Sequence, residues 1–290
     1  MAGTDTTNTV SSFTYRNKYF QANLQQVLRK ALVAEAICQV DRSDAYTLQN
    51  PYSSQPTVTL TSLTGTYSAS DWTTTNDALT VTEEAKYAEH VYQFEAVMSN
   101  FNLFADRADN QAYAIAYAID KYVVNALCED GTGTYSTPSG GFTTASNINT
   151  ICANLLSKVM GYADVYKGLF LVIEAGDTVG FTIAGATNGY SFADSVLNNG
   201  LMTKYMGIDI YVVPDSTFVD ATIGTKTVTN SGHRVFGVKN SSTYMIPRGI
   251  VYEELMVPGR TGKEVRAYCV FGHKLWTQKA GLVVDITVTA

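Results

Sequence analysis

The chain has little charge and no concentration of basic residues. Only 16% of its 290 residues are Asp, Glu, Lys or Arg, and the formal net charge is -6. Arg29-Lys30 is the only basic doublet, whereas a protein that binds nucleic acid tightly carries a clustered basic face. This pattern excludes a basic DNA-packaging protein. It is compatible with a protein wall that contacts DNA weakly or not at all.

Long apolar runs are also absent. A membrane-spanning helix needs about eighteen consecutive apolar residues, and Asp120-Lys121 interrupt the longest candidate. The N-terminal "MAGTDTTNTV" lacks the charged start and the apolar core of a signal peptide. We therefore expect a protein that is made in a cytosol and has no membrane partner.

Clustered metal-ligating residues are missing from the sequence. The chain has four widely spaced cysteines and no C-x-x-C pair: Cys38, Cys128, Cys152 and Cys269. Buried free thiols are the expected state of such cysteines. The histidines His90, His233 and His273 lie far apart, and none has carboxylates at ligand spacing. We expect no metal ion and no cofactor, and structural roles for the histidines.

Catalytic motifs are incomplete. The segment Gly189–Ala193 has the Ser of a nucleophile elbow but lacks the second Gly. Gly262-Lys263 lacks both the upstream Gly and the following Ser or Thr of a phosphate-binding loop. The neighbours Glu83-Glu84 and Glu253-Glu254 would face opposite sides of a strand. We expect no catalytic residue and no enzymatic activity.

The sequence does contain a Thr-rich segment that predicts a two-stranded ribbon. Apolar residues alternate with Thr or Ala in two short stretches: Val58 and Leu60 in residues 57–61, Leu79 and Val81 in residues 78–82. The polar segment Gly65–Asp77, around Tyr67 and Trp72, would connect the strands. A ribbon with so few apolar groups is marginally stable alone. It should therefore lie on another surface, of its own domain or of a neighbouring subunit.

One long amphipathic helix follows the ribbon. From Leu103 to Leu127, residues at three- and four-residue steps form one apolar face, with Ala112, Ile115 and Ile119 as expected core positions. Gly131 supplies a stop signal after the helix. At about 1.5 Å per residue, the helix would be about 35 Å long.

The pattern of the remaining residues predicts a second lobe that contains both helices and strands. It follows a Gly-, Ser- and Thr-rich linker, Gly131–Thr144. Helices and strands are expected in turn: helix Ile148–Met160, strand Leu169–Glu174, a helix near Phe192–Tyr205, and strands Ile208–Val213 and Arg234–Val238. A further helix is expected before the ribbon, from Asn17 to Gln39.

In this order, the pieces resemble the major capsid protein of tailed bacteriophages, which has the Hong Kong 97 fold. The resemblance rests on the ribbon, the segment Lys86–Phe94, and the long helix with Asp120 followed by "EDGTG" at Glu129–Gly133. It continues through three later segments: "LFLVIEAGDTVGF" at Leu169–Phe181, "MGIDIYVVPD" at Met206–Asp215 and "GKEVRAYCVFGHKLWTQKAGLVVDITV" at Gly262–Val288. No single residue is diagnostic, and the order of the pieces carries the resemblance across nearly the whole chain.

The resemblance implies an α+β fold of the Hong Kong 97-like class. Such a fold comprises an N-terminal arm, an extended β-ribbon loop, a peripheral lobe with a long spine helix, and a central α/β lobe. The corresponding boundaries are residues 1–40 for the arm and its helix, 41–85 for the extended loop, 86–135 with 253–290 for the peripheral lobe, and 136–252 for the central (axial) lobe.

The resemblance also implies a structural function. Copies of the chain would form pentamers and hexamers and close into an icosahedral shell around packaged double-stranded DNA. The shell would be assembled in the host cytoplasm and become the wall of the virion. The ribbon would contact the next subunit through six apolar residues: Val58, Leu60, Tyr67, Trp72, Leu79 and Val81. A separate scaffolding protein, a portal and a cement or decoration protein are further partners that such a shell implies.

Two other classes remain open. An encapsulin-type nanocompartment shell shares the fold but encloses a cargo enzyme, and a small DNA-free shell would indicate it. An unrelated enzyme or adhesin with a mixed fold would elute as a monomer. A negative-stain image of the purified protein separates shells from monomers.

Overall fold

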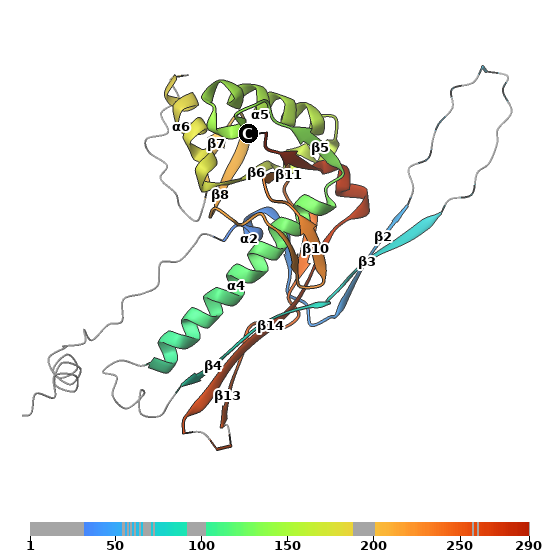
Figure 1. The fold of residues 1–290 in the computed structure, drawn as a ribbon. Coiled ribbons are helices and arrows are strands. Elements are labelled where there is room, and N and C mark those ends of the chain that lie inside the picture. The colour runs from blue at the N-terminus through green and yellow to red at the C-terminus, as the bar shows by residue number, and fades with distance from the viewer. Residues whose placement is uncertain are drawn as a thin grey trace, which may run out of the picture.

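In the computed structural model, two β-sheets pack on one long helix, and a narrow ribbon projects from the body (Figure 1). The structure describes residues 32–53, 73–91, 103–187, 201–256, 258–259 and 261–289, and the isolated positions 56, 58, 60, 62, 63, 65 and 71. The predicted arm, Met1–Arg16, lies outside these residues. Among the helices that are described, none is both long and apolar enough to span a membrane.

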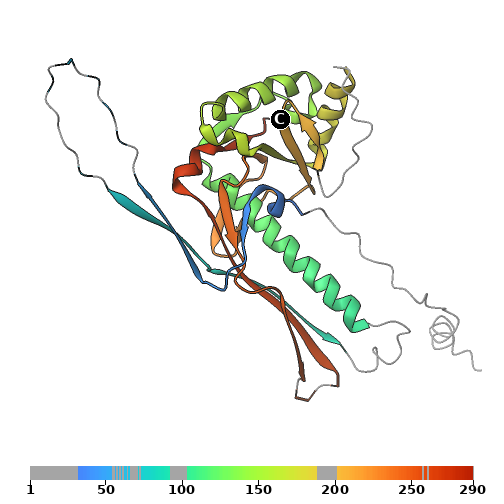
Figure 2. The same cartoon turned by 180° about the vertical axis from the view of Figure 1, so that it is seen from behind.

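The first sheet is organised by the 13-residue strand β14 (Lys263–Leu275). It pairs antiparallel with β4 (Glu83–Val91), β13 (Val251–Met256) and β12 (Ser242–Met245), while β1 (Gln39–Asp41) pairs parallel with β12. Seen from behind, the long helix α4 (Leu103–Asp130) lies along β14 and β4 (Figure 2). Because one face of the sheet is covered, alternate residues of β14 are buried: Val265, Ala267, Cys269 and Phe271.

The second sheet has six strands in the order β5-β15-β11-β6-β8-β7. These strands are β5 (Gly133–Ser136), β15 (Val283–Thr287), β11 (His233–Val238), β6 (Leu169–Glu174), β8 (Ile208–Val213) and β7 (Leu201–Tyr205). β6 runs parallel to β8 and β15 parallel to β5, while β11 is antiparallel to both of its neighbours. β6, β8 and β11 are buried on both faces and are correspondingly rich in apolar residues, although β8 contains Asp209 and β11 begins with His233 and Arg234.

Two helices, α5 (Ala145–Val159) and α6 (Thr178–Thr187), cover one face of the second sheet (Figure 1). α5 follows the 3.6-residue period of an amphipathic helix and buries one side: Ile148, Ile151, Cys152, Leu155 and Val159. Phe181 of α6 stacks on Phe142 of the short turn Gly141–Thr143, with ring centroids 5.9 Å apart. The opposite face of the sheet packs on the end of α4.

The spine helix α4 presents the expected apolar stripe. Ile115 and Ile119 are buried in the central cluster, whereas Ala112 is half-buried. The helix continues three residues beyond the predicted end at Leu127. Gly131 follows it, and its N–H donates to the Leu127 carbonyl oxygen at 3.2 Å, so this orphan carbonyl is satisfied.

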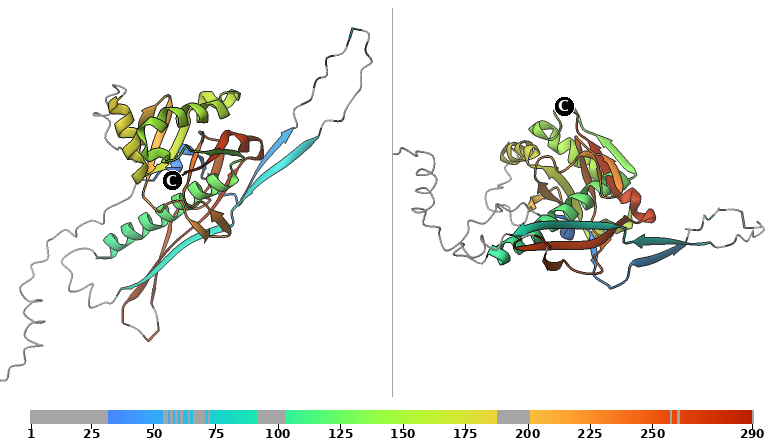
Figure 3. Two further views of the ribbon diagram at one scale, coloured as in Figure 1. Left: turned by 45° about the horizontal axis from the view of Figure 1, so that its top comes forward. Right: turned by 60° about the horizontal axis from the view of Figure 1, so that its bottom comes forward.

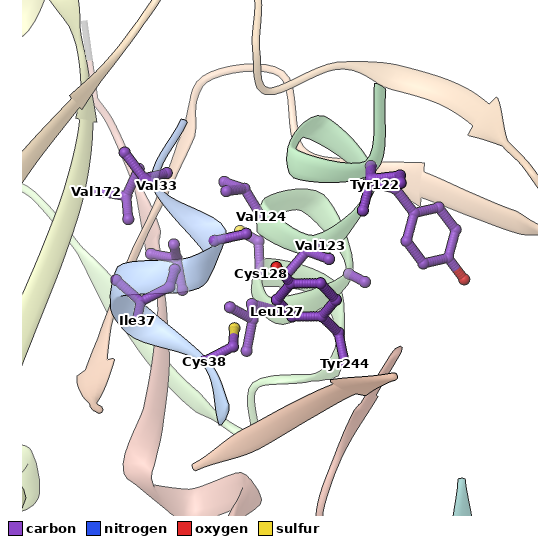
Figure 4. Packing of buried hydrophobic residues seen from close by; sticks show 14 of the residues in the cluster. Val33, Ile37, Cys38, Tyr122, Val123, Val124, Leu127, Cys128, Val172 and Tyr244 are labelled. Carbon is purple, nitrogen blue, oxygen red and sulfur yellow. The ribbon is translucent and has the colours of Figure 1, made fainter. Parts of the chain in front are cut away.

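One apolar core joins both sheets to this helix. Val123, Val124 and Leu127 of α4 are almost completely buried in the same cluster as Val172 of β6 and Tyr244 of β12 (Figure 4). Protein cores are packed to the density of organic crystals, so a side chain at this junction has little freedom to move. The position of α4 therefore determines how the two sheets lie relative to each other.

A buried carboxylate holds the short helix α2 (Ala34–Ile37) on α4. Asp120 Oδ1 accepts hydrogen bonds from the backbone N–H groups of Val33 (2.8 Å) and Ala34 (2.6 Å), which have no intrahelical acceptor. Asp120 is only 4% exposed. This burial raises the pKa of Asp120 to about 6, with a further contribution from Glu35, although the two hydrogen bonds act in the opposite direction.

Two local predictions were wrong. Residues Leu201–Tyr205 form strand β7 rather than the end of a helix, because they pair with β8 at the sheet edge and pairing overrides local propensity. Gln39 belongs to β1 rather than to a helix from Asn17 to Gln39. Of that predicted helix, the described part contains only α2.

The predicted lobe boundaries do not follow the strand pairing. β15 comes from residues 253–290, which the sequence analysis assigned to the peripheral lobe, yet it lies between β5 and β11 in the second sheet. β12 comes from the predicted central lobe, yet it pairs with β14 in the first sheet. These partners are far apart along the chain, and local periodicity carries no information on which strands pair.

Replacing Ile119 by Asp should prevent the formation of soluble, folded subunits. Ile119 is 6% exposed, and an unpaired carboxylate in the core costs several kcal/mol of a stability of roughly 5–15 kcal/mol. Soluble yield and thermal melting measured by circular dichroism test this. Ala118→Asp, on the exposed side of the same helix, is the control and should melt like the wild type. A normal melt for Ile119→Asp would contradict the packing.

Asp120 should make stability depend on pH in the acid range. Its pKa in the folded chain, about 6, lies above the ordinary value of 3.8, so between these values the folded state binds more protons than the unfolded state. The free energy of unfolding should therefore fall as the pH rises from about 4 to about 6, by up to about 3 kcal/mol. Asp120→Asn should remove this contribution. Urea unfolding at both ends of the range measures it, and equal pH slopes for the two proteins would contradict it.

Candidate functional site

The ribbon consists of β2 (Thr47–Ser53) and β3 (Thr74–Thr80), paired antiparallel from Thr47 with Thr80 to Ser53 with Thr74. Both views of Figure 3 show it projecting away from the body. The prediction of the first strand at residues 57–61 was wrong, because Val58 and Leu60 lie beyond the paired strands. The observed strand β2 has the sequence TLQNPYS, with one Thr and a Pro, and it lacks the alternation of residues 57–61 that the prediction followed.

The base of the ribbon is buried in its own subunit. Leu79 lies directly opposite Leu48 in the ladder, and this apolar pair packs with Val81 against Met245 and Trp276. Leu79 is 1% exposed. It therefore has no free surface to offer a neighbour, and the predicted intersubunit role of Leu79 was wrong. The same cluster partly buries Val81.

Polar contacts reinforce this base. Asp77 is buried, forms an ion pair with Lys274 and accepts a hydrogen bond from the Thr277 N–H at 2.9 Å. Burial alone would raise the pKa of Asp77, but the bonds from Lys274 and Thr277 outweigh it and lower the pKa below its ordinary value. Gly272 of β14 passes so close that a Cβ there would lie 2.7 Å from the Thr80 carbonyl oxygen. A side chain at position 272 would therefore displace the ribbon.

Glu83, the first residue of β4, fixes the joint between the ribbon and the body. Its carboxylate is 4% exposed and accepts hydrogen bonds from the Tyr122 hydroxyl of α4 (3.3 Å), the Thr225 N–H (3.0 Å) and the Thr225 hydroxyl. Burial, together with Glu83, raises the pKa of Tyr122, so its hydroxyl keeps the proton that it donates. Thr225 lies in the hairpin between β9 (Asp220–Ile223) and β10 (Lys226–Thr229). The joint thus ties the ribbon to the spine helix and to this hairpin.

The neighbouring Gly224 leaves room for this carboxylate. Its φ of +61° lies in the left-handed region that favours glycine, and a Cβ there would collide with Glu83. No sequence motif marked Glu83, Asp77 or Gly224 as parts of a site. Their partners are about 140 or 200 residues away along the chain, so no local pattern could have revealed them.

Beyond its base, the ribbon segment carries apolar side chains that its own subunit leaves in water. The relative exposure of Val58 is 79%, that of Leu60 is 96% and that of Leu63 is 106%. Tyr67 and Trp72 lie outside the described residues. Exposed apolar groups of this size, gathered on one projecting segment, are typical of a surface that binds another protein.

Exposed apolar side chains also occur on the body, among them residues of α6 and β13. On α6, Val179 and Ile183 are one turn apart and about half exposed. On β13, which belongs to the other sheet, Tyr252 and Met256 are exposed. The subunit therefore has several different apolar surfaces rather than a single one.

The structure also brings together residues that the sequence analysis treated as separate. His233 Nδ1 lies 2.8 Å from Asp285 Oδ1, and the thiol of Cys128 donates to the same oxygen at 3.0 Å. His233 and Asp285 are 52 positions apart, so spacing along the sequence gave no sign of this contact. Cys38, Cys128, Cys152 and Cys269 are all buried free thiols. Ser191 of the incomplete nucleophile motif lies outside the described residues.

Solved structures with the same fold cover nearly the whole chain. A chain from Mycobacterium phage Che8 matches with a TM-score of 0.73 and 17% sequence identity, over 93% of this chain and 96% of that chain. A chain from the capsid of the cyanophage P-SCSP1u matches with a TM-score of 0.70 and 12% identity, over 94% and 92% of the two chains. A chain from the capsid of an empty GTA particle matches with a TM-score of 0.67 and 14% identity, over 94% of this chain and 95% of that chain.

No family model and no curated protein matches the sequence. At identities this low, the structural likeness establishes the fold. The predicted fold class, α+β and Hong Kong 97-like, is confirmed.

Two leucines near the ribbon should respond differently to the same substitution. Leu79→Ala should lower the free energy of unfolding of the unassembled subunit by about 2–5 kcal/mol, because it leaves a cavity at the base. Leu60→Ala should change it by less than about 0.5 kcal/mol, because Leu60 is in water. Urea unfolding of both variants measures the difference. Equal losses would show that the ribbon segment is not divided into a buried base and a free outer part.

Proposed function

We propose that this chain is a major capsid protein, the structural subunit of an icosahedral bacteriophage shell. The observation that carries the proposal is the ribbon, which is rigidly anchored at its base and exposes large apolar side chains beyond it. The fold supports the same conclusion, because it is shared over more than nine-tenths of the chain with a chain from Mycobacterium phage Che8 and with chains from a cyanophage capsid and a GTA-particle capsid. A structural role requires no catalytic residue.

Assembly would use different surfaces of each subunit. A ribbon on one side that binds a different patch on the next copy is a heterologous contact, and such contacts close into rings when the rotation between copies is right. Pentamers and hexamers are the proposed rings, and the capsid of the GTA particle was solved with C5 symmetry. The exposed residues on α6 and β13 give the subunit further surfaces for neighbours.

We assign the second sheet with α5 and α6 to the axial lobe, and the first sheet with α4 to the peripheral lobe. Val58 and Leu60 would contact the adjacent subunit, as would Tyr67 and Trp72 farther along the same segment. Permanent interfaces of this kind bury about 2,000–5,000 Å². Non-covalent burial on that scale would hold the shell together.

Packaged double-stranded DNA would be the content of the shell. The net charge of -6 favours weak contact with DNA, because tight binding requires clustered basic residues. A scaffolding protein, a portal and a cement or decoration protein are proposed partners, with assembly in the host cytoplasm. The phage and GTA origin of the similar chains favours this function over an encapsulin-type compartment.

Removing the outer ribbon should stop assembly and leave the subunit folded. Ser53 and Thr74 form the last pair of the ladder, so residues 54–73 can be replaced by an Asn-Gly turn that suits a two-residue hairpin. The buried base stays intact, and the thermal midpoint should stay near that of the wild type. Negative-stain images should show shells for the wild type and none for the truncated chain.

A matched control replaces residues 54–73 by a Gly-Ser segment of the same length. It keeps the reach of the ribbon but removes its apolar side chains, and it should also fail to assemble. Uniform shells from the truncated chain would disprove the role of the ribbon. Shells from the Gly-Ser variant alone would show that length, rather than apolar contact, is what assembly requires.

A further inference from the structure

Three side chains with metal-ligating atoms meet at the end of the spine helix. Cys128 lies in the last turn of α4, His233 begins β11 and Asp285 lies in β15. One ligand atom from each lies within 4.8 Å of the other two. Asp285 pairs with Val235 across the ladder, so His233, two residues from Val235, presents its side chain on the same face. The pairing of two strands under a helix end creates this group.

We propose that Cys128, His233 and Asp285 form a binding site for a divalent cation of the zinc class. Thiolate, imidazole and carboxylate are the ligands that zinc takes in proteins, at about 2.3, 2.0 and 2.1 Å. Tetrahedral bonds of these lengths separate the ligand atoms by roughly 3.3–3.7 Å. The carboxylate oxygen now lies 2.8 Å from His233 Nδ1 and 3.0 Å from Cys128 Sγ. Small side-chain rotations therefore suffice to admit the ion.

The location of the three residues gives an ion access from solvent and allows a water molecule to serve as the fourth ligand. The side chains of His233 and Asp285 are 24% and 22% exposed, so an ion can enter from solvent and keep one water molecule. Cys128 is buried beneath them. A site with three protein ligands and one open position results.

Negative charge close to the three residues favours the binding of a cation. The C-terminal end of a helix carries a partial negative charge, and the last turn of the 28-residue helix α4 has no basic residue to neutralise it. Glu129 and Asp130 follow Cys128 directly, and Lys226 pairs with Asp130. The positive guanidinium of Arg234 also lies nearby: it pairs with Glu174 and Asp177 and donates to the His233 carbonyl oxygen at 2.6 Å. The Arg234 carbonyl oxygen accepts a weak bond from Cys128 at 3.8 Å.

Binding of the ion exchanges one proton for one metal. The thiol of Cys128 releases its proton to solvent as the sulfur–metal bond forms. The proton that His233 Nδ1 donates to Asp285 moves to Nε2 through solvent, which frees the Nδ1 lone pair for the ion, and the carboxylate releases no proton. Without the ion, the thiol and the imidazole both hydrogen-bond to Asp285. With it, three segments far apart in sequence are joined where the spine helix meets the second sheet. Affinity should fall as the pH is lowered, because protons compete for the ligands.

The test measures zinc bound to the purified full-length chain. Metal-free protein is dialysed against Zn²⁺, desalted, and analysed for zinc by mass spectrometry. About one zinc per chain is expected for the wild type. Occupancy should fall at least tenfold in Cys128→Ser and in His233→Ala. Cys152→Ser, which alters another buried thiol in α5, is the matched control and should keep its zinc.

Cobalt provides a second readout, because a thiolate bound to Co²⁺ gives a charge-transfer absorption band. The band should appear in the wild type and in Cys152→Ser, and it should be absent from Cys128→Ser. If Cys128→Ser does not fold, His233→Gln is the variant to measure, because position 233 is partly exposed. Its zinc content, and the rise of its melting temperature with Zn²⁺, should both be lower than those of the wild type. A wild type without zinc, or variants that bind as much as the wild type, would overturn the proposal.

Discussion

Burial of the spine helix against both sheets is the interaction on which the rest of the structure depends. Its apolar stripe removes Ile115, Ile119, Val123 and Leu127 from water within one continuous core. The polar groups of the same helix then fix its neighbours. Asp120 holds α2, Tyr122 reaches the joint at Glu83, and Cys128 meets β11 and β15. A shift of the helix would therefore move every one of these contacts.

The ribbon combines a rigid base with an outer part that the subunit does not cover. Asp77 and Glu83 are buried carboxylates, and burying a charge is costly unless hydrogen bonds and opposite charges satisfy it. Both are satisfied by partners from β14, α4 and the β9–β10 hairpin, so they specify the direction in which the ribbon leaves the body. In the outer segment, Leu60 is exposed to water. In a shell subunit, the neighbour would complete the burial.

Local sequence patterns predicted the elements that depend on local physics. Strands β6 and β8 were predicted at the residues where they occur, because a strand buried on both faces is mostly apolar, with Asp209 as the one charged interruption within β8. The spine helix and α5 were found within a few residues by their 3.6-residue period. The order of these elements was enough to indicate the fold class. The position of the first ribbon strand was missed, because the alternation of Thr with apolar residues lies beyond β2, whose own sequence is mostly polar and contains Pro51.

The sequence by itself thus determined the main helices, the central strands and the fold class, since each follows from spacing along a short stretch of chain. Only the tertiary structure decided which strands pair, which face of the ribbon's base is buried, and which distant polar residues meet. Leu79 became a core residue through Leu48, Met245 and Trp276, and His233 met Asp285 through the pairing of β11 with β15. Such contacts join residues 31 to about 200 positions apart, and their energy depends on packing and burial that exist only once the chain has folded.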